Sequence, residues 1–212
     1  MATQLGLYNA ALLEIGDRGL ASLAEDVEAR RVLDLCYADA VAGCLEAGSW
    51  NFATRTIKAD ADTEITPVFG FAHVFAKPDD WVRTSAVSLD ENLAVPLTRY
   101  VDDVDYWSAD ATPIYVRYVS DAPSWGLDLT LWPRSFTRYV ELELAWRISE
   151  RLTQNASKRE LIGRDRDRAK RNALNKDALN EAQPKFAPLS SWTTARGGAA
   201  ARERGNRGSL IG

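Results

Sequence analysis

The chain has 212 residues, of which 46% are hydrophobic, so it can bury a sizeable core in one domain or in one domain with an appendage. No apolar run approaches the ~18 residues that span a bilayer, and no basic flank followed by an apolar stretch opens the N-terminus, so we expect neither membrane insertion nor secretion. The net charge of −4 is unevenly spread. Residues 1–52 contain 3 basic and 8 acidic side chains, residues 53–134 contain 7 and 13, residues 135–182 contain 11 and 8, and residues 183–212 contain 5 and 1. This polarity indicates that the two ends of the chain meet different surroundings.

Two amphipathic helices are expected at the start, over residues 5–15 and 25–48. The first places Leu5, Tyr8, Leu12 and Ile15 on one face and ends at Gly16, which suits a left-handed cap. The second has an acidic first turn, which favours the positive end of the helix dipole. Its apolar residues fall into two stripes, 29-32-36-40 and 33-37-41-44-45, so we expect it to be packed between neighbours.

The chain offers little for metal binding or disulfide formation. Cys36 and Cys44 lie eight residues apart in one predicted helix, about 12 Å of rise, which is too far for a disulfide. They are interpreted as small buried apolar residues in a reducing compartment. His73 is the only histidine, and its spacing to the cysteines matches no zinc site, so we expect no metal and no cofactor.

The middle of the chain is predicted to be β-rich. Short runs at residues 82–87, 94–100 and 114–119 are separated by Pro, Asp, Asn and Gly, and indicate five or six short antiparallel strands. Residues 90–92 and 125–126 have the composition of hairpin turns.

Helical periodicity returns at Ser135, a candidate N-cap, and continues through Phe136, Val140, Leu144, Ile148 and Leu152. A fourth, highly charged helix is expected over residues 157–182. The predicted fold class is α+β. A helical bundle forms from residues 1–53 and 135–183, residues 54–134 form an inserted antiparallel β-rich domain, and residues 184–212 form an extended tail.

The acidic side chains are not arranged as a recognisable catalytic site. Pairs occur at 79–80, 102–105 and 141–143, but adjacency in sequence shows neither two acids facing each other across a cleft nor one held protonated in an apolar pocket. His73 lies in an alternating apolar context, and the chain lacks both a nucleophile elbow and a phosphate-binding loop. No catalytic residue is therefore predicted, and solvated loops account for most of the acids.

The tail cannot order itself alone, so we expect a partner to hold it. Docking on a protein is favoured over nucleic-acid binding, because too few aromatics interleave with its arginines for base stacking. The predicted docking residues are the apolar anchors Trp192, Leu210 and Ile211 and the orienting charges Arg196, Arg202, Arg204 and Arg207.

Among the seven tryptophans, core positions are expected for Trp50, Trp81 and Trp146, whereas Trp107 and Trp125 lie near turn signals and are candidate subunit or tail-side interface residues.

Three stretches together resemble the head-to-tail adaptor family of tailed bacteriophages, which includes tail tubular protein A, head completion proteins and gatekeepers. They are the 7–16 helix with its Ser-Trp-Asn-Phe-Ala exit at 49–53, the 71–83 segment with Lys-Pro-Asp-Asp-Trp-Val-Arg at 77–83, and the Pro-Arg-Ser-Phe helix start at 133–136 leading to Glu-Leu-Ala at 143–145.

The resemblance implies a non-enzymatic virion protein of the neck, made in the host cytoplasm. It implies a ring of twelve subunits beneath the portal protein, with the tail reaching up onto the portal and a nozzle, stopper or tail protein below. The acidic β region would face the channel or the tail side, where like charge lets DNA pass without sequence-specific binding. Two other interpretations stay open, a peptidoglycan hydrolase carried in the virion and a nucleic-acid-binding module that uses the basic tail.

Overall fold

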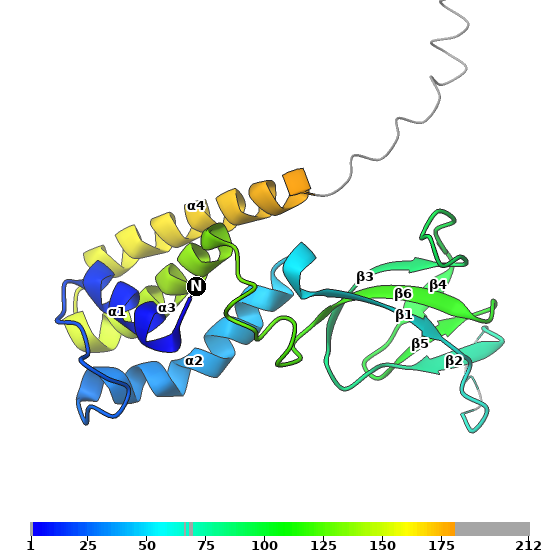
Figure 1. Ribbon diagram of the computed structural model, residues 1–212, viewed down its shortest axis with the longest axis horizontal. Helices are drawn as coiled ribbons and strands as arrows, with labels where there is room; N and C mark the ends of the chain where they lie inside the picture. Colours follow the sequence, from blue (N-terminus) through cyan, green and yellow to red (C-terminus); the bar gives the residue numbers. More distant parts are fainter. Residues whose placement is uncertain (1, 66, 68–69, 181–212) are drawn as a thin grey trace, which may run out of the picture. The chain divides into compact units, whose positions relative to one another are not determined.

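A computed structural model describes residues 2–65, 67 and 70–180 of the protein (Figure 1). The chain divides into two compact units, Met1–Ala178 and Leu179–Gly212, and the first contains both sheets and all but the last two residues of the fourth helix. The architecture is α+β, as predicted.

Four helices form the bundle: α1 (Gln4–Ile15), α2 (Glu28–Glu46), α3 (Arg134–Thr153) and α4 (Ala156–Asn180). The α1 helix begins after Thr3, whose side-chain oxygen accepts a hydrogen bond from the Gly6 amide, and ends at Gly16 with φ +73°, the left-handed cap expected there. All four lie close to their predicted ranges, because a sustained 3.6-residue period is a strong signal.

Two predicted helix starts are corrected by the structure. The α2 helix starts three residues later than expected, because Glu25 stays in the preceding loop and accepts hydrogen bonds from the Ala21 amide and the Arg18 side chain. Ser135 is not the N-cap of α3, since Pro133 occupies that position without a side-chain bond and Ser135 lies inside the first turn. A proline needs no N–H donor there, which makes it a good residue at a helix start.

The bundle core is built from one face of each helix. Its buried members include Leu12 of α1, Leu33 of α2, Leu144 of α3 and Ile162 of α4. On α2 both apolar stripes contact the core. Leu33, Val41, Cys44 and Leu45 of one stripe and Ala40 of the other are buried, while Ala29, Val32 and Cys36 are half-buried and pack against the core.

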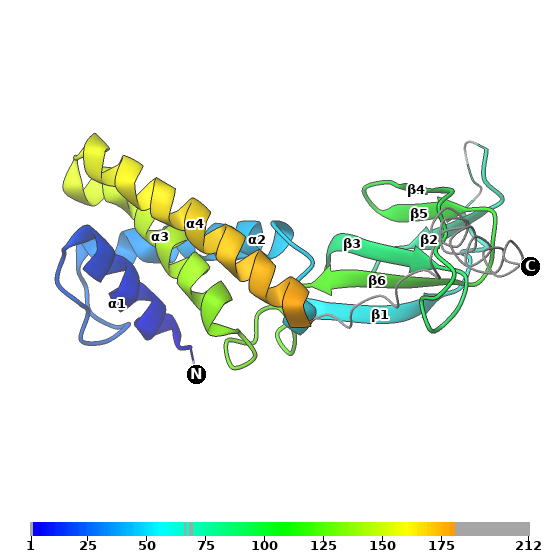
Figure 2. The same cartoon turned by 90° about the horizontal axis from the view of Figure 1, so that it is seen from above.

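The β insertion contains two three-stranded antiparallel sheets that pack against each other (Figure 2). The first has the order β1 (Thr54–Ala59), β6 (Ile114–Ser120), β3 (Trp81–Ser88), and the second has the order β2 (His73–Ala76), β5 (Tyr106–Ala109), β4 (Tyr100–Asp102). Side chains from both sheets form a second core around Phe75, Trp107 and Val116. A short 3₁₀ turn, Asn51–Ala53, connects the bundle to β1.

The predicted strand over residues 94–100 is wrong, although the number of strands is within the predicted range. Of that run only Pro96 pairs, in an isolated bridge with Ser88, together with Tyr100, which is the first residue of β4. A proline cannot donate to a ladder, and the Asp90 carboxylate holds the amides of Ala94 and Val95 in the preceding turn. Residues 90–92 form a turn between β3 and the bridge at Pro96, as predicted. The turn at residues 125–126 lies between β6 and α3, so the prediction of a hairpin there is wrong because no strand follows it.

Candidate interaction surfaces

The three stretches that resemble the adaptor family converge where the β insertion leaves the bundle. Phe136, at the start of α3, has its ring centroid 4.8 Å from those of Trp50 and Phe52 and 4.9 Å from that of Trp132. The Trp50 indole donates to the Cys44 carbonyl at 2.9 Å, which ties this aromatic cluster to the end of α2. The first and third stretches therefore share one buried cluster.

The second stretch reaches the same junction through Asp80. Its carboxylate accepts from Arg55 of β1 at 2.6 Å, from the Tyr118 hydroxyl of β6 at 3.1 Å, and from the Ser120 hydroxyl. Val82 packs against the bundle core, and Arg83 donates to the Glu46 carbonyl at the end of α2. Asp80, just before β3, thus contacts β1 and β6, while Val82 and Arg83 of β3 contact the bundle.

The pKa of Asp80 is lowered. Burial alone would raise it, but the hydrogen bonds from Ser120, Arg55 and Tyr118 stabilise the charged form and outweigh burial. A general acid needs the opposite shift, so Asp80 is a structural anchor within this network and does not suit the proton-donor role of a hydrolase.

Other chemically reactive groups are also held in structural roles. Burial, reinforced by Glu143, raises the pKa of the Cys44 thiol to about 12, which keeps it protonated and unreactive. Asp102 pairs with Lys77 at 2.5 Å, and Lys77 in turn lies 3.4 Å from the Trp81 ring centroid. Across residues 2–65, 67 and 70–180 no group of three potential ligands could hold a metal ion, and no helix is long and apolar enough to cross a membrane.

The two candidate interface tryptophans differ in the structure. Trp125 is 38% exposed, lies in the predicted turn and has the Arg55 guanidinium 5.6 Å from its ring centroid, so it is accessible to a partner. Trp107 is fully buried in β5, and its indole donates to Thr84 Oγ1 at 2.9 Å. Trp107 is therefore a core residue. Where two sheets pack face to face, alternate side chains of each strand point into the space between the sheets, even beside a turn.

Trp50 is buried, as expected, whereas Trp81 and Trp146 are only half-buried. The seven predicted docking residues of the tail, Trp192, Arg196, Arg202, Arg204, Arg207, Leu210 and Ile211, lie outside the described residues.

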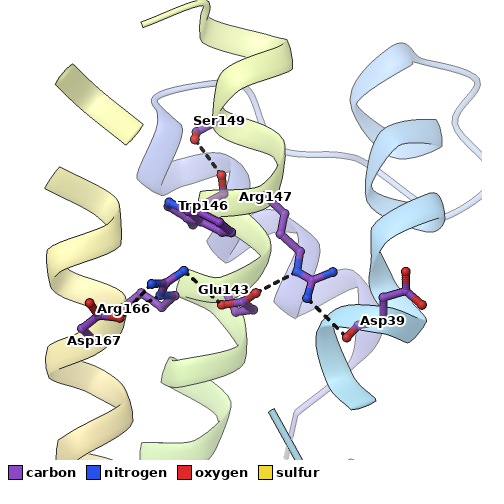
Figure 3. A network of polar contacts seen from close by, with 7 residues as sticks. All are labelled: Asp39, Glu143, Trp146, Arg147, Ser149, Arg166 and Asp167. Carbon is purple, nitrogen blue, oxygen red and sulfur yellow. Dashed lines mark hydrogen bonds and ion pairs between the residues drawn. The ribbon is translucent and has the colours of Figure 1, made fainter. Parts of the chain in front are cut away.

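A charged network joins three helices of the bundle (Figure 3). Glu143 of α3 is 9% exposed and accepts from Arg147 Nε at 2.7 Å, and its second carboxylate oxygen lies 3.6 Å from Arg166 Nη1 of α4. Arg147 also reaches the Asp39 carbonyl of α2 at 3.5 Å. The sequence offered only one sign of this network, the i,i+4 spacing of Glu143 and Arg147.

Trp146 lies between two guanidinium groups. The guanidinium carbon Cζ of Arg166 lies 4.4 Å from its ring centroid, and that of Arg159 lies 4.6 Å from it. Gly163 of α4 leaves room for the indole, since a Cβ at that position would lie 3.4 Å from the ring. Cation–π contacts and close approach together hold α4 against α3.

Two helices present exposed stripes of different charge. On α2 the outward residues are Leu35, Ala38, Asp39, Ala42 and Glu46, and Leu35 is 81% exposed. On α4 they are Leu161, Arg164, Arg168 and Arg171, and Leu161 is 59% exposed. These two sets are named the acidic stripe and the basic stripe. Large exposed apolar side chains on a helix face are typical of interaction surfaces.

The comparisons with known proteins give no family assignment. No model of a protein family matches the chain, and a search of curated proteins found no significant match.

Proposed function

We propose that this protein is a structural head-to-tail adaptor of a tailed phage or a phage-like particle, which forms a ring beneath the portal and joins it to the next tail component. The observation that carries the proposal is the meeting of the three adaptor-like stretches at one junction. Trp50 and Phe52 of the first stretch contact Phe136 of the third, while Val82 and Arg83 of the second contact the bundle.

The architecture supports this proposal. An adaptor needs a rigid body with separate surfaces for the portal, the neighbouring subunits and the tail, and heterologous ring contacts need two different complementary faces. The bundle and the β insertion have separate cores, and the aromatic cluster together with Val82 and Arg83 of β3 joins them. This arrangement can hold several partners at fixed relative positions.

The charge distribution supports the proposed placement of the C-terminal tail on the portal and of the β insertion at the channel or the tail side. In the proposed assembly the basic tail docks on the portal, with Trp192, Leu210 and Ile211 as apolar anchors. The β insertion carries an excess of acidic residues, and its β4–β5 turn contains Asp103, Asp105 and Val104, which is 82% exposed. An acidic surface at the channel or the tail side would repel DNA and let it pass.

The proposal is tested by removing the tail. Deletion of residues 190–212 leaves the described bundle and β insertion intact, so we expect a folded protein that no longer binds portal. Portal binding is measured by co-sedimentation, and folding by circular dichroism of the truncated chain. The matched control is the full chain with Trp125 changed to Ala, which alters an accessible tryptophan elsewhere and should still bind portal. Unchanged binding by the truncated protein would contradict the proposal.

The same truncation separates the alternative interpretations. If the tail binds nucleic acid, the full chain binds DNA with an affinity that falls steeply with salt, and the truncation abolishes it. If the protein is a hydrolase, peptidoglycan is turned over and changing one carboxylate stops the turnover. We expect neither result.

A further inference from the structure

The α2 and α4 helices lie along opposite edges of the bundle and run in the same direction, from left to right in Figure 1. A head-to-tail ring repeats one subunit by a modest rotation, so it brings one edge of each bundle against the opposite edge of the next. In such a ring the α4 of one copy meets the α2 of its neighbour with both helices running in the same general direction, although they cross obliquely in Figure 2.

The two stripes match in charge. Within the described residues, the Asp39 and Glu46 carboxylates of the acidic stripe form no ion pair, and neither do Arg168 and Arg171 of the basic stripe. Asp39 does interact electrostatically with Arg147 of α3 in the same subunit. Arg164 pairs with Glu160 at 2.6 Å, but both side chains are about two-thirds exposed, and an exposed pair of this kind exchanges at little cost. Two further acids flank the basic stripe in sequence: Asp165 follows Arg164, and Asp167, which pairs with Arg166, precedes Arg168.

The two stripes also match in spacing. Asp39 and Glu46 are seven residues apart, as are Arg164 and Arg171, which is about 10.5 Å along each helix. In the parallel arrangement Leu35 then lies near Leu161, and Ala42 lies opposite Arg168. Small residues at 38 and 42 allow the long arginine stems to lie close to α2.

An apolar groove beside the acidic stripe completes the match. Its apolar lining is Val32, Leu35 and Cys36 of α2, and its charged lining is Glu28 and Arg31 of α2 with Arg147 and Arg151 of α3. It lies on the half-buried side of α2, where Val32 and Cys36 also pack against the bundle core. Leu161 of an adjacent copy is an apolar side chain of suitable size for it.

We infer that the basic stripe of α4 docks on the acidic stripe of α2 in a second copy of this chain, and that this contact is the repeating lateral interface of the proposed ring. The inference deepens the proposed adaptor function and rests on it for the ring itself. One helix pair buries less than the ~1,200 Å² of a stable interface, so the contact is weak between isolated copies and strengthens when the ring closes.

The contact is tested by cross-linking the protein alone, without portal. In a background with Cys36 changed to Ala, one sample carries Ala42→Cys and the other Arg168→Cys, and the two are mixed at millimolar concentration with a short thiol–thiol cross-linker. Cys44 is buried and stays in place. We expect about tenfold more cross-linked dimer than for a control mixture of Leu13→Cys with Arg168→Cys, because docking raises the local concentration of the facing thiols. Leu13 is 74% exposed on α1 and lies outside both stripes.

Charge reversal then identifies the pairing. Asp39→Arg with Glu46→Arg in all copies should remove the excess, and so should Arg164→Glu with Arg171→Glu. All four changes in every copy should restore it, because the signs are then exchanged on both stripes. Three results would overturn the inference: no more cross-linked dimer than in the Leu13 control, an unchanged yield of dimer after charge reversal, or a yield that the four changes together do not restore. Portal takes no part in this experiment. If the wild-type protein did not bind portal, that would contradict the adaptor function but would leave the cross-linking result unaffected.

Discussion

Asp80 is the residue on which most polar contacts of the junction depend. Asp80→Asn removes the charge that Arg55, Tyr118 and Ser120 stabilise, and hydrogen bonds to a charged group are worth roughly 1.5–3 kcal/mol. The free energy of unfolding at pH 7 should fall by about that amount. Urea denaturation followed by tryptophan fluorescence gives the value.

The same substitution should change the acid sensitivity of the protein. The folded pKa of Asp80 is lowered, so its contribution to stability is fully present above the unfolded pKa of about 3.9 and is lost as the pH falls through the folded pKa. The stability difference between wild type and Asp80→Asn should therefore shrink below about pH 4. Asp79→Asn, at the exposed neighbouring position, is the control and should change neither quantity. A difference that persists undiminished in acid would contradict this role of Asp80.

Gly126 is required for a steric reason. A Cβ at this position would lie 2.1 Å from the Ser120 carbonyl oxygen, so Gly126→Ala must displace backbone in the turn that carries Trp125. We expect a loss of about 1–3 kcal/mol in thermal or urea unfolding. Gly43→Ala is the matched control, because its nearest neighbour atom would be 3.7 Å away on an exposed helix, and it should be neutral or stabilise by roughly 0.5–1 kcal/mol.

At this scale the sequence indicates residue types better than their burial. The turn at residues 125–126 was predictable from its composition. The close approach of Gly126 to Ser120 was not, because Ser120 belongs to a strand that ends six residues earlier. Trp107 and Trp125 have similar local contexts, and only the stacking of two sheets, which is a long-range event, buries the first and leaves the second accessible.

At the scale of elements, α4 is held by a few specific contacts. It contributes Ile162 and Ala173 to the core and stacks Arg159 and Arg166 on Trp146 of α3. Trp146→Ala removes two cation–π contacts of about 0.5–1 kcal/mol each together with the apolar area of the indole. We expect α4 to open locally while α1–α3 stay closed.

Hydrogen exchange measures this difference. Amides of α4 should exchange faster in Trp146→Ala, whereas those of α1 and α3 should keep most of their protection. Trp125→Ala, which removes a tryptophan from outside the bundle, should leave α4 protection unchanged. Equal loss of protection across all four helices would indicate that Trp146 stabilises the whole bundle.

The helices were predictable because each carries at least three turns of periodic apolar residues. The strands were less so: β4 has three residues, and the apolar run before it contains a proline that forms only an isolated bridge. The contact of Glu143 with Arg166 joins α3 to α4 across a sharp turn at Gln154, and a one-dimensional pattern contains no signal for such a pair.

At the scale of the whole molecule, the proposed contacts are individually weak and different in kind. The lateral contact joins two charged helix stripes, and the portal contact is assigned to the tail. The composition of residues 184–212 predicts a tail that orders only on its partner, and the entropy cost of that ordering would make assembly conditional on the partner. We therefore expect the purified protein to be monomeric and to form a ring only when portal is added.

The mass of the particle with and without portal tests this expectation. Native mass spectrometry should find single chains alone, and with portal a complex whose added mass corresponds to twelve copies. In the charge-reversed variant Arg164→Glu with Arg171→Glu, copies still bind portal through the tail but do not support one another laterally, so partially filled rings should appear. The variant that exchanges the signs on both stripes should restore complete rings. Complete rings in the absence of portal would contradict the proposed order of assembly, because lateral contacts alone would then suffice.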